Sequence, residues 1–117
     1  MTTPATDNFR SVGPEDAVPN GSVIPFHLED PKLTVSIARV DGRPYAFDDA
    51  CTHRGCPLSG GQLTGTTITC QCHGSRFDIT TGAVINGPAT DPLGVYEVKE
   101  IEGSIRIRLD DKVSRDE

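Results

Sequence analysis

The sequence predicts an all-β protein built from short antiparallel strands. The chain of 117 residues contains 12 glycines and 9 prolines, which interrupt helices. Its apolar residues do not recur with the helical period over any long stretch, and several short runs instead alternate between apolar and polar residues. Turn-forming residues separate these runs. The length corresponds to one domain, so we expect a single domain over residues 1–117.

The clearest strand is LTVSIARV, residues 33–40, in which Leu33, Val35 and Ile37 share one face. A hairpin turn follows, and the run 43–49 leads back to the first cysteine. The other expected strands cover residues 9–12, 22–28, 62–63, 66–69, 77–79, 83–85, 94–101 and 104–109. Residues 13–21 have turn chemistry, and the two prolines of NGPATDP, residues 86–92, predict a stiff loop. Both ends of the chain are expected to be tails.

Charge and hydropathy limit the partners and the compartment. With 11 basic and 17 acidic residues, the net charge is −6, which disfavours nucleic acid and anionic membranes and favours a basic partner protein. No apolar stretch approaches the roughly 20 residues of a spanning helix, and the N-terminal residues lack the pattern of a signal peptide. We therefore expect a soluble cytoplasmic protein without a membrane anchor.

All four cysteines and two of the three histidines lie in two short loops, CTHRGC at 51–56 and CQCHGS at 70–75. Two disulfides would be one interpretation for a secreted protein, but the missing signal peptide favours a metal site. Structural zinc would need four ligands, usually with C-x2-C or H-x3-5-H spacing. Here the spacing differs, and each loop would give one thiolate and one imidazole as ligands, a division that suits a binuclear site, although zinc stays an alternative.

These two loops resemble the two halves of the Rieske iron-sulfur motif, and the resemblance extends over most of residues 43–109. It implies a Rieske-type fold of stacked small antiparallel sheets, with a cluster-binding subdomain, about 48–88, inserted in a β basal domain. It also implies a [2Fe-2S] cluster with one iron bound by two cysteines and the other by two histidines. The implied ligands are Cys51, His53, Cys70 and His73, and the implied cluster-covering loop contains Gly87 and Pro88.

The resemblance also implies roles for four further residues. Cys56 and Cys72 occupy the positions of a disulfide found in the Rieske proteins of cytochrome bc complexes, although each could instead be a small buried thiol. Ser75 matches a serine that donates a hydrogen bond to the cluster and raises its potential; the alternative is a turn hydroxyl. Phe77 stands where high-potential members have a tyrosine. We therefore expect a potential between the ends of the Rieske range, roughly −150 to +300 mV.

The residue inventory also bears on function. After His53 and His73 are used, only His27 is left, whereas a Rieske oxygenase needs a second iron held by two histidines and a carboxylate. The resemblance thus implies an electron-transfer protein and not an enzyme. It implies a ferredoxin component, a monomer in isolation, that passes electrons from a flavin-dependent NAD(P)H reductase to a ring-hydroxylating or similar terminal oxygenase.

Two other functions stay open at this point. The cysteine pair and Ser75 also fit a Rieske subunit of a quinol-oxidising complex or of a molybdenum enzyme of the arsenite oxidase type. A zinc-containing or disulfide-stapled binding module is the third alternative.

Overall fold

The computed structural model describes residues 9–29, 32–52, 55–72, 74–87 and 89–108 of the chain. Within these ranges the regular structure consists of β-strands and two short 3₁₀ helices, which confirms the all-β prediction. The elements are β1 (Phe9–Pro14), η1 (Glu15–Ala17), β2 (Val23–Glu29), β3 (Lys32–Val40), β4 (Arg43–Asp48), η2 (Leu58–Gly60), β5 (Gln62–Thr64), β6 (Thr67–Thr69), β7 (Arg76–Asp78), β8 (Val84–Asn86), β9 (Val95–Ile101) and β10 (Ser104–Arg108).

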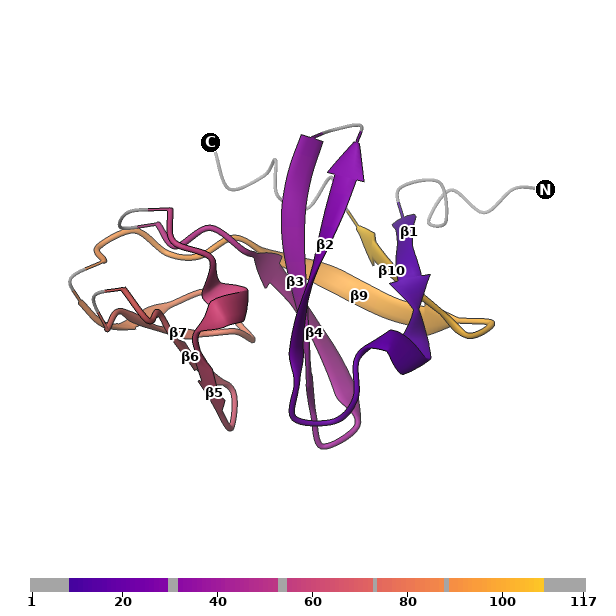
Figure 1. The fold of residues 1–117 in the computed structure, drawn as a ribbon, viewed down its shortest axis with the longest axis horizontal. Coiled ribbons are helices and arrows are strands. Elements are labelled where there is room, and N and C mark those ends of the chain that lie inside the picture. The colour runs from indigo at the N-terminus through magenta and orange to yellow at the C-terminus, as the bar shows by residue number, and fades with distance from the viewer. Residues whose placement is uncertain (1–8, 30–31, 53–54, 73, 88, 109–117) are drawn as a thin grey trace.

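The strands form two antiparallel sheets, which lie beside one another in Figure 1. The large sheet has six strands in the order β1-β10-β9-β4-β3-β2, and the small sheet has four in the order β5-β6-β7-β8. In the large sheet β4 pairs with β9, where Ala46 lies opposite Tyr96 and Phe47 opposite Val95. The chain between these two neighbouring strands carries both cysteine loops and the whole small sheet. One long excursion from the large sheet therefore contains the candidate site.

The large sheet is buried on both faces around β3 and β4. Val35 and Ile37 lie in one apolar core, as the alternation predicts, but Ser36 and Ala38 on the other face are buried as well. The first core contains Val18, Leu28, Val35, Ile37, Ala46, Tyr96, Ile105 and Ile107. The second contains Ala38, Phe47, Cys51, Leu58, Ile68, Cys70, Phe77, Ile79, Ala89 and Leu93, and it extends from the large sheet to the small one. The strand alternation did not predict the second core because its side chains come from both sheets and from the segments between them.

One predicted turn has the expected backbone conformation, and another is replaced by the continuation of a strand. At the β3–β4 hairpin, Asp41 and Gly42 have φ of 53° and 79°, as the predicted two-residue turn requires. At the N-terminus, strand β1 does not stop before Gly13 but continues to Pro14 after an irregularity in its pairing with β10. A Cβ atom on Gly13 would lie 2.7 Å from the ring of Phe26. Gly13 therefore serves packing against that ring and not the predicted turn.

Candidate metal centre

The two cysteine loops have the same backbone hydrogen bonds. In the loop 51–56, the Cys51 N–H donates to the Cys56 carbonyl at 2.9 Å, and the Gly55 N–H donates to the Cys51 carbonyl at 2.7 Å. In the loop 70–75, the N–H of Cys70 donates to the Ser75 carbonyl at 2.8 Å, and the N–H of Gly74 donates to the Cys70 carbonyl at 3.0 Å. In their described residues the two loops thus share one pattern of backbone bonds, which begins at a cysteine in each.

A glycine at the fifth position makes this loop possible. Gly55 and Gly74 have φ of 78° and 82°, a left-handed conformation that glycine adopts without steric cost. We did not single out these glycines from the sequence. The signal was present, since both loops read Cys-x-x-x-Gly and the residue four positions after each first cysteine is glycine.

The first cysteines of the loops are both buried and both unbridged. Cys51 and Cys70 are 3 % exposed and have free thiols. They lie in the second apolar core together with Leu58 and Phe77. Thiolates are the cysteine form that binds iron, so two equivalent thiols from matching loops fit the predicted pair of ligands on one iron. His53 and His73 lie outside the described residues, and the imidazole pair stays a prediction.

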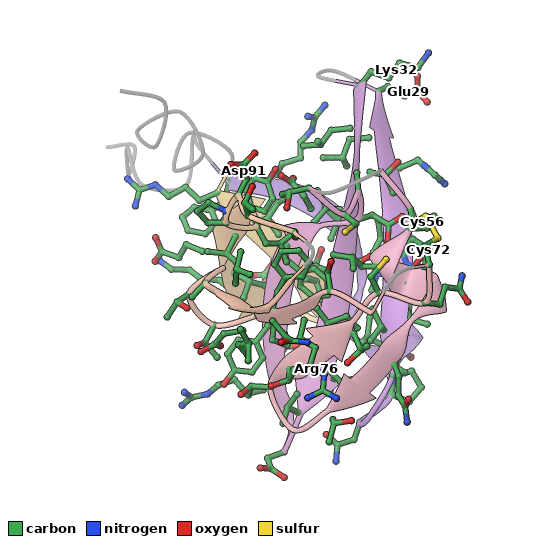
Figure 2. The ribbon with its side chains drawn as sticks, turned by 90° about the vertical axis from the view of Figure 1, so that its left-hand side faces the viewer. Glu29, Lys32, Cys56, Cys72, Arg76 and Asp91 are labelled. Carbon is green, nitrogen blue, oxygen red and sulfur yellow. A yellow bond between two sulfur atoms is a disulfide. The ribbon has the colours of Figure 1, made fainter. Side chains whose placement is uncertain are left out.

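The remaining two cysteines form a disulfide between the loops. Cys56 and Cys72 are bonded to each other, with their Cα atoms 6.5 Å apart, as the resemblance implies (Figure 2). The sulfur atoms of Cys56, Cys70 and Cys72 all lie within 4.8 Å of one another. This trio is not a three-thiolate site, because two of its sulfurs are consumed in the disulfide. It places the Cys70 thiol directly beside the bridge that joins the loops.

Hydroxyl groups attach the following loop, residues 87–92, to both cysteine loops. Ser75 is fully buried, and its Oγ accepts a hydrogen bond from the Ala89 N–H at 3.0 Å. Thr52 Oγ1 donates to the Asp91 carbonyl at 2.8 Å. The Ser75 hydroxyl hydrogen is not used in the bond to Ala89, and its donation to the cluster stays a prediction. Gly87, predicted to be part of the cluster-covering loop, is exposed. Pro88, the other residue predicted for that loop, lies outside the described residues.

A buried carboxylate holds the entrance to the first loop. Asp49 follows β4, and its Oδ1 accepts hydrogen bonds from the Ser36 hydroxyl at 2.7 Å and from the Ser59 N–H at 2.8 Å. The Asp49 carbonyl also accepts from the Leu58 N–H at 2.6 Å. These bonds connect β3, the start of the first cysteine loop and η2. They therefore fix the position of that loop relative to the large sheet. Sequence analysis did not identify this role for Asp49.

Two predicted side chains outside the ligand set are also described. Phe77 is fully buried and lies opposite Ile68 in the pairing of β7 with β6. Its influence on a reduction potential stays a prediction. His27 is exposed in β2, and its Nδ1 lies 2.8 Å from Thr34 Oγ1, so this third histidine has a hydrogen-bond partner at the surface. Within the described part of the chain, no helix has the length and apolar character that crossing a bilayer requires.

The chain is similar in sequence to proteins that contain a Rieske domain. The profile of the Rieske [2Fe-2S] domain family matches residues 8–97. The ferredoxin component of the naphthalene 1,2-dioxygenase system of Pseudomonas aeruginosa is 38 % identical over 93 residues, which are 80 % of this chain and 86 % of that protein. The cytochrome b6-f complex iron-sulfur subunit of Chlorobaculum tepidum is 33 % identical over 102 residues, covering 87 % of this chain but 54 % of that subunit.

A solved structure is similar in fold as well as in sequence. It is described as a complex of reduced oxygenase and oxidized ferredoxin in carbazole 1,9a-dioxygenase. The matched chain superposes with a TM-score of 0.79 at 32 % identity, covering 86 % of this chain and 93 % of that one.

Proposed function

The chain belongs to the Rieske [2Fe-2S] domain family, and from that premise we propose that it is a one-electron carrier, the ferredoxin component of a multicomponent oxygenase. Its cofactor is a Rieske [2Fe-2S] cluster, which takes up and releases one electron at a time when bound. Cys51 and Cys70 would hold one iron, and His53 and His73 would hold the other. The cluster-binding subdomain would span about residues 48–88.

The observation that carries this proposal is the pair of matching loops with one free buried thiol each. The loops place Cys51 and Cys70 in equivalent backbone settings, and both cysteines are buried in the second apolar core. The Cys56–Cys72 disulfide and the hydroxyl of Ser75 hold the surrounding segments together. These are features of a rigid site, and rigidity suits a carrier, because little structural reorganisation then accompanies each change of charge.

Relatives suggest the direction of electron flow. Related chains are named as ferredoxin components of dioxygenase systems, and one solved relative is in complex with a terminal oxygenase. By analogy the chain would take electrons from a flavin-dependent NAD(P)H reductase and deliver them to the oxygenase. Catalysis would belong to the oxygenase, because this chain has one histidine besides the two predicted ligands, too few for a mononuclear iron site. We further propose that it acts in the cytoplasm as a monomer.

The test is reconstitution with defined partners. The purified protein should contain iron and sulfide and should be brown, whereas a zinc protein would be colourless. NADH together with the reductase of the Pseudomonas aeruginosa naphthalene 1,2-dioxygenase system should bleach its visible spectrum, and addition of the oxygenase of that system should restore it. A protein that binds iron but exchanges electrons with neither component would contradict the ferredoxin assignment.

A second candidate is a Rieske subunit of a quinol-oxidising or molybdenum-containing complex. The Cys56–Cys72 disulfide favours it, and so does the similarity to the cytochrome b6-f subunit, of which this chain spans about half. Protein-film voltammetry separates the two candidates. A ferredoxin with Ser75 but with Phe77 in place of a tyrosine should have a midpoint potential between the ends of the Rieske range of roughly −150 to +300 mV, and a quinol-linked subunit should lie near the upper end.

A further inference from the structure

The outer face of the small sheet carries a shallow polar hollow. It has a volume of about 400 Å³ and is lined by Gln62, Thr64, Thr67, Thr69 and Arg76. The strand register explains this composition. Gln62 on β5 lies opposite Thr69 on β6, and Thr69 lies opposite Arg76 on β7. The alternate residues Leu63, Ile68 and Phe77 point the other way and pack in or against the second core.

The cation in this hollow is not neutralised by the described part of the chain. Arg76 is exposed, and among the described residues no carboxylate forms an ion pair with it. Asp78 lies two residues further along β7, but its carboxylate accepts hydrogen bonds from the Thr80 hydroxyl at 2.6 Å and the Thr80 N–H at 2.9 Å. Those bonds direct Asp78 to its own turn. Figure 2 shows the Arg76 side chain lying over the ribbon at the surface.

The chemistry of the lining selects a type of ligand. Arginine has a planar fork of donors that matches a carboxylate in a bidentate arrangement, and threonine hydroxyls and a glutamine amide supply further donors beside it. One positive charge balances one carboxylate, whereas a phosphate dianion would be left partly uncompensated on a chain of net charge −6. The hollow therefore suits a single carboxylate side chain.

The position of the hollow selects the partner. Thr69 immediately precedes Cys70, and Arg76 immediately follows Ser75, so both side chains flank the second cysteine loop. A protein that approaches this loop to exchange an electron would place its own surface over Thr69 and Arg76. A carboxylate at the rim of such an interface would fix the orientation of the partner as well as add affinity.

We propose that Arg76, with Thr69 and Gln62, binds an aspartate or glutamate side chain of the terminal oxygenase. This inference rests on the proposed function, because it assumes that an oxygenase accepts the electron. It adds to that function a specific anchor on the outer face of the small sheet. The partner that it predicts has one acidic residue beside its electron-entry site, on a surface that is otherwise basic, as the net charge of −6 favours.

The experiment measures association of the cluster-loaded chain with the oxygenase of the reconstituted system, by calorimetry and by electron-transfer rate, at several salt concentrations. Arg76→Gln should weaken association about tenfold and make its salt dependence less steep, because one charge-assisted pair is lost. Arg76→Lys should recover only part of the affinity, because an ammonium group lacks the guanidinium fork. Thr69→Val, which keeps the side-chain shape, should weaken association by a smaller factor.

Arg43→Gln is the matched control. Arg43 is also exposed but begins β4, at the end of that strand remote from Cys51. It should leave association within twofold of the wild type, and no variant should change the visible spectrum or the midpoint potential. Equal effects of Arg76→Gln and Arg43→Gln, or no effect of Arg76→Gln, would overturn the inference. A wild-type chain that transfers no electron to the oxygenase would instead overturn the proposed function.

Discussion

The large and small sheets achieve burial in different ways. Strands of the large sheet run from five to nine residues, and their core consists of apolar side chains with one buried tyrosine. Every strand of the small sheet has three residues, and the core beneath it includes the thiols of Cys51 and Cys70. Short ladders contribute few hydrogen bonds, so the small sheet depends more on cross-links and on the cofactor. The large sheet should therefore stay folded when the site in the small sheet is damaged. Damage to the large sheet, in contrast, should also disrupt the site.

Truncating the largest buried side chain of the small sheet should have the largest effect. Phe77→Ala should lower the free energy of unfolding by about 3–5 kcal/mol, because it leaves a cavity beneath both cysteine loops. Ile105→Ala, in the core of the large sheet, should cost about 2–5 kcal/mol. Denaturant unfolding gives the stabilities, and iron content gives cluster retention. Only Phe77→Ala should lose iron under conditions where the protein stays folded, and equal iron loss in both variants would remove the distinction between the sheets.

Removing the disulfide should have the next largest effect and should stay confined to the small sheet. The bridge closes a loop with a sequence separation of 16, for which chain entropy predicts about 3 kcal/mol. The double variant Cys56→Ser/Cys72→Ser should release iron faster and lose hydrogen-exchange protection in β5–β8. Protection in β3 and β9 should be unchanged, and wild-type protein treated with a thiol reductant should behave in the same way. Loss of protection in both sheets would show that they unfold as one unit.

Removing the Ser75 hydroxyl, which connects the second cysteine loop to the segment 87–92, should have a smaller effect. Ser75→Ala leaves the buried Ala89 N–H without its acceptor, which should cost about 1–3 kcal/mol. It also removes the predicted donor to the cluster, so the midpoint potential should fall. Thr52→Val is the matched variant, since it breaks the bond to the Asp91 carbonyl at an exposed site. Voltammetry should show a lower midpoint potential for Ser75→Ala and an unchanged one for Thr52→Val. A shift of equal size in Thr52→Val would show that displacement of the segment 87–92, and not loss of the Ser75 hydroxyl, lowers the potential.

Much of this organisation can be predicted from the sequence, and the exceptions have physical causes. The resemblance to the Rieske motif implied the Cys56–Cys72 bridge, and local alternation predicts the strand boundaries to within about one residue, except at the end of β1. The burial of Ser36 and Ala38 does not follow from local pattern, because it depends on distant segments: Ala38 packs in the second core, and the Ser36 hydroxyl donates to Asp49. The network of Asp49 was missed for a similar reason, since its partners come from β3 and from the segment that follows the first loop. Contacts between segments distant in sequence carry no local pattern.

The smallest expected effect concerns the turn that ends β7. Hydrogen bonds from the Thr80 hydroxyl and the Thr80 N–H hold the pKa of Asp78 below its usual value of 3.8. A carboxyl whose pKa is lower in the folded state adds stability above its unfolded pKa, and this stability is lost as the pH falls through the folded pKa. Asp78→Asn should therefore lower hydrogen-exchange protection of β7 and β8 slightly at neutral pH, and the difference from wild type should disappear in acid. Asp16→Asn, an exposed carboxylate in η1, should give no difference at either pH. A deficit in Asp78→Asn that persists in acid would assign the effect to altered packing, because the charge contributes nothing there.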